Sequence, residues 1–198
     1  MRASFQYGLR RLTSSAKQLG ADQQAAQILE FALALPVLMV FVVGIFDFSG
    51  ALAIKQKITN AAREAARVAA ADPANDLNST TPVSVSDAFQ VVANYLKSEN
   101  IHDCGLSGNM TPTVSGTVWT SATLTGCPGG TGLTLTVDRG CVTQQSINGT
   151  TTDIVNTCVT ILYPYSWRFS GVMKVLLPQT TYARVIYIKG NAAAFNEN

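Results

Sequence analysis

The feature that most constrains this chain is an apolar run over residues 31–46, followed without a break by a second helical pattern that continues to about residue 71. The run holds no charged side chain, with Glu30 at its front edge and Asp47 at its far edge. Because an α-helix rises by about 1.5 Å per residue, one helix over residues 26–71 would be a rod several times longer than its width. A rod that is apolar in its first half and amphipathic in its second is typical of an assembly element.

A membrane span is the interpretation we favour for the first half of this rod. A spanning helix needs about 20 apolar residues, and residues 26–48 reach that length with Glu30 at one interface. A buried core helix is the alternative, but Val, Leu, Phe and Met stand on all faces of the run, which favours lipid around it. Pro36 removes one helix hydrogen bond and is expected to bend the rod.

In the second half, apolar and small residues recur at helical spacing on one face: Ile54, Ile58, Ala61, Ala62, Ala65, Val68 and Ala69. We expect this face to pack beneath the chain's own domain, with the part nearest the membrane available to other subunits. Pro73 is expected to end the helix.

The charge balance excludes one class of partner and leaves the membrane orientation undecided. Charged residues make up only 13% of the 198 residues, and a net charge of +2 does not indicate a nucleic-acid partner. The positive-inside rule is nearly tied. Basic residues lie on both sides of the apolar run, at Arg2, Arg10, Arg11 and Lys17 before it and at Lys55, Lys57, Arg63 and Arg67 after it.

The cysteines break this tie. All four follow the apolar run, and none stands in a Cys-x-x-Cys pair of the kind that zinc sites use. The sequence therefore favours two disulfides in an oxidising compartment, with isolated buried thiols as the alternative. The N-terminus would then lie inside, and the C-terminal domain outside, on a single-pass anchor in the cytoplasmic (inner) membrane.

The C-terminal half predicts a small α+β domain. A helix is expected to begin at Ser86 as its N-cap and to stop near Asn100. Strands are expected over residues 113–119, 133–143, 153–163 and 180–189, giving an antiparallel sheet of about four strands with one inserted helix, and residues 191–198 are expected to form a tail. We thus expect three parts: a cytoplasmic basic leader over residues 1–25, a transmembrane and stem helix over 26–71, and an extracytoplasmic domain over 72–198.

One turn in this domain predicts a disulfide. Asn148-Gly149 is a strong signal for a two-residue β-hairpin turn, and folding there places Cys141 across from Asn156, one diagonal step from Cys158. A bulge or a small offset would allow a Cys141–Cys158 disulfide. Cys104 and Cys127 would then form the second pair by elimination.

An ordinary secretory signal peptide is a rival interpretation of the N-terminus. The segment has a basic start, an apolar run and Ala51-Leu52-Ala53 as a small-x-small cleavage site. Against it, residues 51–71 are among the strongest helix-forming stretches of the chain, and the basic region is long for a signal peptide. We therefore favour a retained anchor.

The N-terminal pattern resembles a known family. Glu-Phe-Ala-Leu-x-Leu-Pro at residues 30–36, the apolar run, and Ala-Ala-Arg-Glu-Ala-Ala-Arg-Val-Ala-Ala at residues 61–70 are similar to the TadE-like proteins. These are pseudopilins, or minor pilin-like components, of the tight-adherence (Flp, type IVc) pilus system. The resemblance implies a pilin-like fold, other pilin-like subunits and pilus-assembly membrane proteins as partners, and a place in the membrane or in a surface pilus.

The resemblance also implies a processing site. In this family a prepilin peptidase leaves glutamate as the fifth residue of the mature chain, so a cut would fall between Ala25 and Ala26. The family pattern has glycine where Ala25 stands, so both a cleaved and an uncleaved anchor stay open.

The role of the acid can be argued from physical chemistry. An acid at the membrane boundary is unfavourable unless it is paired or solvated. A free ammonium at Ala26 could pair with Glu30 of a neighbouring helix and set a one-subunit stagger. The alternative is a Glu30 side chain that simply reaches the lipid headgroups.

The leading hypothesis is therefore a non-enzymatic, membrane-anchored, TadE-like component that helps to assemble a pilus or related secretion machine through helix packing. A membrane-anchored binding or adhesion module that is not built into a pilus is the alternative. An enzymatic function is the weakest hypothesis, because the chain has one histidine, His102, and no metal, nucleotide or other cofactor motif. We assign no catalytic, cofactor-binding or metal-ligating residue.

Overall fold

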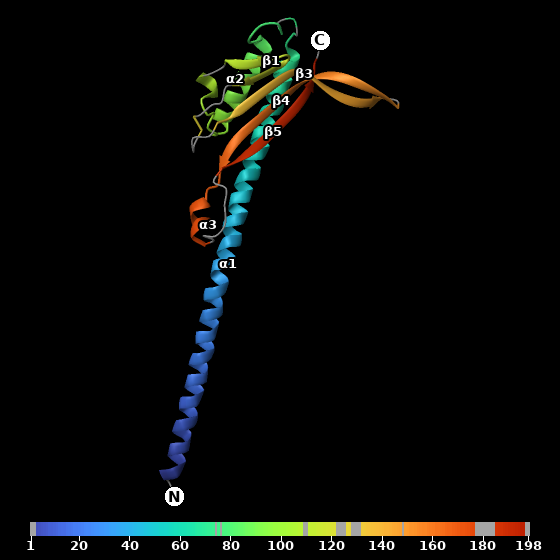
Figure 1. Ribbon diagram of the computed structural model, residues 1–198. Helices are drawn as coiled ribbons and strands as arrows, with labels where there is room; N and C mark the ends of the chain where they lie inside the picture. The colour runs from blue at the N-terminus through green and yellow to red at the C-terminus, as the bar shows by residue number, and fades with distance from the viewer. Residues whose placement is uncertain are drawn as a thin grey trace. The chain divides into compact units, whose positions relative to one another are not determined.

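The structure is a computed structural model, and it places five strands and three α-helices among the residues it describes (Figure 1). The backbone is described for residues 3–73, 75, 77–108, 111–121, 126–127, 132–147, 149–176 and 185–196, and side chains within these ranges from residue 25 onward, except at positions 147, 173 and 176. The chain divides into two compact units. The N-terminal unit comprises Met1–Phe46 and Gly171–Thr180, and the sheet unit comprises Asp47–Ser170 and Thr181–Asn198.

Helix α1 (Ala3–Ala71) is the longest element and passes through Pro36 without ending. It is already helical over residues 3–25, which the sequence had set apart as a leader distinct from the helix. We call residues 25–46 of α1 the apolar segment and residues 47–71 the stem. The helix stops at Ala71, two residues before Pro73, as expected from the ring that removes a helix hydrogen bond.

The α+β fold is confirmed, with five strands in the sheet where about four were expected. The strands are β1 (Pro112–Ser115), β2 (Val118–Ser121), β3 (Thr134–Ile147), β4 (Thr150–Ser166) and β5 (Val185–Phe195), all antiparallel and in chain order across the sheet. The extra strand arises because Gly116 adopts φ +61° and turns the chain inside the segment predicted as one strand. The tail predicted from residue 191 is wrong, since β5 continues through residue 195 against β4.

Helix α2 (Val83–Ser98) begins three residues earlier than its predicted cap. Pro82 occupies the N-cap position, and its carbonyl accepts the backbone N–H groups of Val85 and Ser86. Ser86 lies inside the first turn, where its hydroxyl donates to the Val83 carbonyl. The proline explains the early start, because its fixed φ suits a helix entrance and it has no N–H to satisfy.

One hydrophobic core joins the stem, α2 and one face of the sheet. The stem contributes Ile58 and the alanines, α2 contributes Phe89 and its neighbours, and the sheet contributes the alternating residues Trp119, Leu135, Val137, Val159 and Ile161. Strand β5 passes very close to the stem at Gly190, where an added Cβ would lie 2.6 Å from Ile58 Cγ2 and 2.9 Å from the Ile58 carbonyl oxygen. The predicted apolar face of the stem is thus confirmed, and a glycine allows the strand to approach it.

Candidate functional site

The apolar segment is the most unusual surface among the described residues. Large apolar side chains remain exposed over most of it, and Phe41 is 66% exposed, whereas Val43 is buried. These side chains are Ile28, Leu29, Phe31, Leu33, Leu35, Val37, Leu38, Met39, Phe41, Val42, Ile45 and Phe46. A continuous apolar surface of this extent needs lipid or another protein around it. Within the described chain, α1 is the one helix long and apolar enough to cross a membrane.

The residues that the sequence singled out on this helix all lie at its surface. Ala25, Ala26 and Glu30 are exposed, and Pro36 is exposed within the continuous helix. An exposed Glu30 has no counter-charge within this chain among the ion pairs that the structure describes. Its surroundings leave the carboxylate available to a partner outside the chain, and the roles predicted for Ala25, Ala26, Glu30 and Pro36 stay predictions.

Asp47 directly follows the apolar run, and its buried side chain also accepts hydrogen bonds within the sheet unit. Its side chain is only 1% exposed, and its Oδ1 accepts backbone N–H bonds from Arg168, at 3.1 Å, and Phe169, at 3.3 Å. A carboxylate is a strong acceptor for backbone N–H groups, so this acid ties the end of β4 to the helix. Sequence spacing could not reveal the contact, because the partners are more than a hundred positions apart.

A tyrosine packs beside this contact. Tyr165 stacks edge-on against Trp167, with ring centroids 5.5 Å apart. Its hydroxyl lies where a side chain on Gly50 would be, 2.8 Å from an added Cβ. Burial raises the pKa of Tyr165, and the negative charge of Asp47 raises it further. The phenol therefore stays neutral beside the buried acid.

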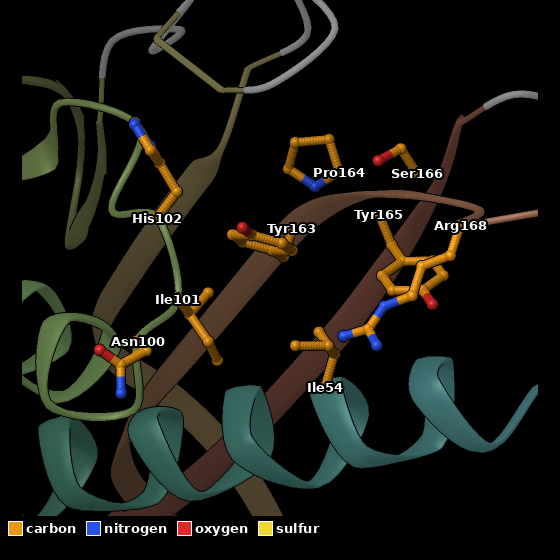
Figure 2. A pocket seen from close by; sticks show the side chains of 9 residues that line it. All are labelled: Ile54, Asn100, Ile101, His102, Tyr163, Pro164, Tyr165, Ser166 and Arg168. Atoms are coloured by element: carbon orange, nitrogen blue, oxygen red, sulfur yellow. The ribbon is translucent and has the colours of Figure 1, made fainter. Parts of the chain in front are cut away.

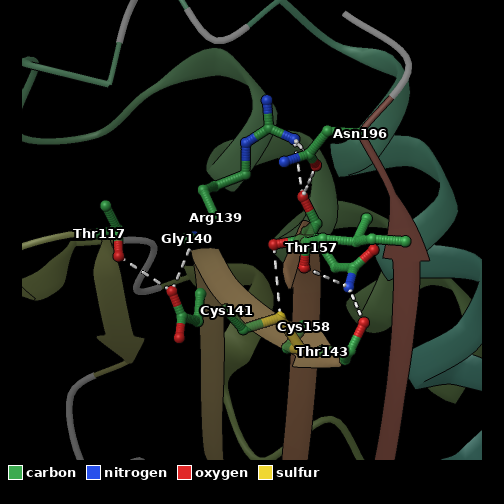
Figure 3. The surroundings of a disulfide bond; sticks show 11 residues. Thr117, Arg139, Gly140, Cys141, Thr143, Thr157, Cys158 and Asn196 are labelled. Atoms are coloured by element: carbon green, nitrogen blue, oxygen red, sulfur yellow. Dashed lines mark hydrogen bonds between the residues drawn. A yellow bond between two sulfur atoms is a disulfide. The ribbon is translucent and has the colours of Figure 1, made fainter. Parts of the chain in front are cut away.

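A buried arginine binds the C-terminal end of the stem. Arg139 donates from Nη1 to the Ala69 carbonyl and from Nη2 to the Asp72 carbonyl at 2.8 Å. The last carbonyls of a helix have no partner within it, and a cation there is also favoured by the helix dipole. Arg139 also donates to Thr157 Oγ1 at 2.8 Å, and Thr157 donates to Asn196 at 2.6 Å (Figure 3).

A bulge in β3 aims Arg139 at the helix. The register between β3 and β4 shifts between Asp138 and Cys141, so Arg139 and Gly140 occupy the irregular positions. Such bulges re-aim a side chain. An added Cβ at Gly140 would lie 2.5 Å from Thr117 Oγ1, and Asp138 Oδ1 accepts from both Thr117 Oγ1 and the Gly140 N–H.

The same bulge accommodates a disulfide. Cys141 lies opposite Asn156, as the hairpin predicted, and Cys158 lies opposite Asp138. The structure pairs Cys141 with Cys158, at a Cα–Cα distance of 6.0 Å (Figure 3). It also pairs Cys104 with Cys127, at 4.4 Å. These are the two pairs that the sequence suggested. Gly149, in the hairpin turn, has φ +80°, whereas Asn148 lies outside the described residues.

A shallow pocket of about 280 Å³ lies between the stem and the end of β4 in the sheet unit (Figure 2). Tyr163, Pro164 and Tyr165 line it together with Ile54, Ile101 and His102. His102 is committed elsewhere, because its Nδ1 accepts the backbone N–H of Cys104 at 2.9 Å. Among the residues described, no three His, Cys, Asp or Glu side chains gather in a way that could hold a metal ion.

One comparison with known proteins matches the part of the chain that carries these surfaces. Residues 25–67 match the model of the family described as TadE-like protein. No curated protein and no solved structure matches the chain. The matched residues comprise the apolar segment, Asp47 and most of the stem, which are the parts whose surfaces stand out in the structure. Over residues 25–67, the chain is similar to the TadE-like proteins.

Proposed function

We propose that this protein is a non-enzymatic, membrane-anchored component that assembles a tight-adherence (type IVc) pilus or a related secretion machine through packing of its N-terminal helix. The observation that carries the proposal is the apolar segment, where twelve large apolar side chains are exposed among the described residues, while Val43 is buried. The family match to the same residues supports a pilus-related role. The two disulfides support an extracytoplasmic sheet unit, with the N-terminus on the cytoplasmic side.

In this proposal the two parts of α1 have separate tasks. The apolar segment lies in lipid and contacts the helices of other pilin-like subunits, where van der Waals packing and polar contacts drive association. Glu30 sits at the inner boundary and pairs with a cation of a neighbour, most simply the ammonium at Ala26 after cleavage by a prepilin peptidase. The stem carries the sheet unit and is already covered by it.

Photo-crosslinking in cells tests which surface meets other subunits. We would place p-benzoylphenylalanine at Phe41, which is 66% exposed in the apolar segment, and at Phe195, which is 56% exposed on β5. Crosslinks to pilin-like or assembly proteins are expected from position 41. Crosslinks from position 195 alone would favour the alternative, an anchored binding module whose sheet unit makes the contacts.

The boundary acid has its own test with a matched control. Glu30→Gln is expected to reduce co-purification of the protein with other pilin-like subunits after detergent extraction. Glu64→Gln, which removes an acid that pairs with Arg67 on the stem surface, is expected to leave it unchanged. Equal behaviour of the two variants would contradict the register role of Glu30.

The mature N-terminus decides between processing routes. After co-expression with a prepilin peptidase, mass spectrometry of the purified chain should find Ala26 as the first residue if the leader is cut. A first residue at Ile54, which follows Ala51-Leu52-Ala53, would mean ordinary secretion without an anchor and would overturn the proposed function.

A further inference from the structure

We propose that the turn Trp167–Phe169 and the following helix α3 (Ser170–Leu176) lie in the membrane–water interface, so that the chain contacts the phospholipid bilayer at a second place besides its span. The inference rests on the proposed membrane anchor. It adds to that anchor a surface that the family match, which ends at residue 67, does not include.

The level of the turn relative to the span comes from Asp47. This residue directly follows the charge-free run, so it stands where a spanning helix leaves the hydrocarbon. Its buried carboxylate holds the backbone N–H groups of both Arg168 and Phe169. Two hydrogen bonds to one carboxylate keep the turn within a side chain's reach of that boundary.

The side chains at the turn are those that membrane interfaces favour. Trp is enriched at the headgroup level, and the half-buried Trp167 packs edge-on against the buried Tyr165, which supports it from the protein side. Arg168 is exposed and carries a cation that can meet lipid phosphates while its stem lies on apolar atoms. Figure 2 shows Arg168 and Tyr165 together above the stem helix, at one end of the pocket.

Helix α3 continues this surface in sequence. Phe169, Val172 and Val175 recur every third position, and Val175 is 80% exposed although it is purely apolar. Residues at this spacing share one side of a helix. The compact unit that holds Gly171–Thr180 also holds residues 1–46, which include the apolar segment. An apolar side that belongs with a membrane-spanning segment is covered most simply by the lipid around that segment.

Tryptophan fluorescence can test the turn in the full-length protein. The chain has two tryptophans, and the other, Trp119, is fully buried in the core. We would reconstitute wild type and Trp167→Phe into phosphatidylcholine vesicles with or without lipids brominated near the headgroup end of their chains. Brominated lipid should remove most of the emission by which wild type exceeds W167F, and W167F itself should be unaffected.

A second pair of variants tests α3 with a matched control. In the W167F background we would introduce Val175→Trp and, separately, Val155→Trp on β4, where valine is 53% exposed. Brominated lipid should quench the tryptophan at 175 and leave the one at 155 unchanged. Equal emission with and without bromine at both 167 and 175 would overturn the inference and point to another protein subunit, or water, at this surface.

Flotation of the same vesicles separates this inference from the proposed function. A chain that floats with the vesicles but shows no quenching at 167 or 175 keeps its anchor and loses only the second contact. A chain that does not float contradicts both. Emission of Trp119 at the short wavelengths of a buried indole serves as the check that every variant has folded.

Discussion

The apolar segment and the stem of helix α1 both carry apolar side chains, but most of the large ones in the apolar segment are exposed, whereas the apolar face of the stem is buried. In the apolar segment, most of the large Leu, Val, Ile and Phe side chains are exposed, and Val43 is the exception with 7% exposure. In the stem, Ile58 and the alanines from Ala61 to Ala69 are completely buried under α2 and the sheet. Hydrophobicity alone therefore does not tell which half packs on the chain's own domain.

Side-chain size tells them apart. Alanine removes little area from water when it is buried, but it lets another backbone approach closely. In the stem this approach is used, since Gly190 of β5 lies against the backbone of Ile58. Large side chains in the apolar segment carry far more apolar area, which in water would be strongly unfavourable and in lipid or between subunits is not. The small residues of the stem suit close packing within the chain, whereas most large residues of the apolar segment are exposed.

The largest effect is expected where the stem meets β5. Gly190→Val would place Cβ within 3 Å of the Ile58 backbone, which a side-chain rotation cannot relieve. We expect the sheet unit to lose about 3 kcal/mol of unfolding free energy, at the upper end of overpacking effects. Urea unfolding in detergent measures it, in the W167F background so that the fluorescence reports Trp119 alone.

A glycine in the apolar segment is the matched control. Gly44 has no atom within 4 Å of an added Cβ, so Gly44→Ala should leave the unfolding midpoint of the sheet unit unchanged. A loss of unfolding free energy in Gly44→Ala as large as that in Gly190→Val would contradict the division of α1 into an exposed apolar segment and a buried stem face.

The next effect concerns the end of the stem. Arg139→Met keeps the length of the side chain but removes the donors to the Ala69 and Asp72 carbonyls. Buried acceptors without a partner are unfavourable, and we expect a loss of about 2 to 3 kcal/mol. Arg139→Lys should lose less, because a lysine keeps the charge at the helix C-terminus but cannot reach both carbonyls in one plane. Equal losses for the two variants would show that charge plays no part.

These contacts define what the sequence could predict. The membrane-length run, the stem face, the hairpin and the Cys141–Cys158 pair follow from local periodicity and turn chemistry, and each agrees with the structure. The Cys104–Cys127 pair was predicted by elimination and also agrees. Arg139, Asp47 and Gly190 could not be found in that way, because their partners lie 70 or more positions away or depend on a bulge. The division of one predicted strand by Gly116 and the start of α2 at Pro82 were open to sequence analysis, since glycine and proline mark such points.

A direct exchange of size between the two halves tests the role of alanine. Ala65→Leu inserts three carbons into the packed core and is expected to destabilise the sheet unit by roughly 2 kcal/mol. Ala34→Leu makes the same change on the exposed apolar segment and should leave that stability unchanged. Thermal unfolding of the two variants in one detergent provides the measurement. A stable Ala65→Leu variant would mean that the stem tolerates larger residues and that its alanines serve another purpose.

The smallest expected effect is a difference in stability at low pH between the sheet unit and the apolar segment. Burial raises the pKa of Asp103, but hydrogen bonds from Ser107 and Gly105 and the charge of Lys97 outweigh it and hold that pKa below its ordinary value of 3.8. The stabilisation by Asp103 is therefore complete above about pH 4 and is lost as the pH falls through the lowered pKa of the folded state.

Asp103→Asn should lower the stability of the sheet unit by about 1 kcal/mol at neutral pH. The difference between wild type and variant should shrink as the solution is acidified below pH 4, because the wild-type carboxyl then becomes neutral as well. The apolar segment has no charged side chain after Glu30, so its helical circular dichroism should persist at pH values where the sheet unit loses its Trp119 signal. A difference between wild type and variant that stays constant down to pH 2 would show that Asp103 acts through its shape and not through its charge.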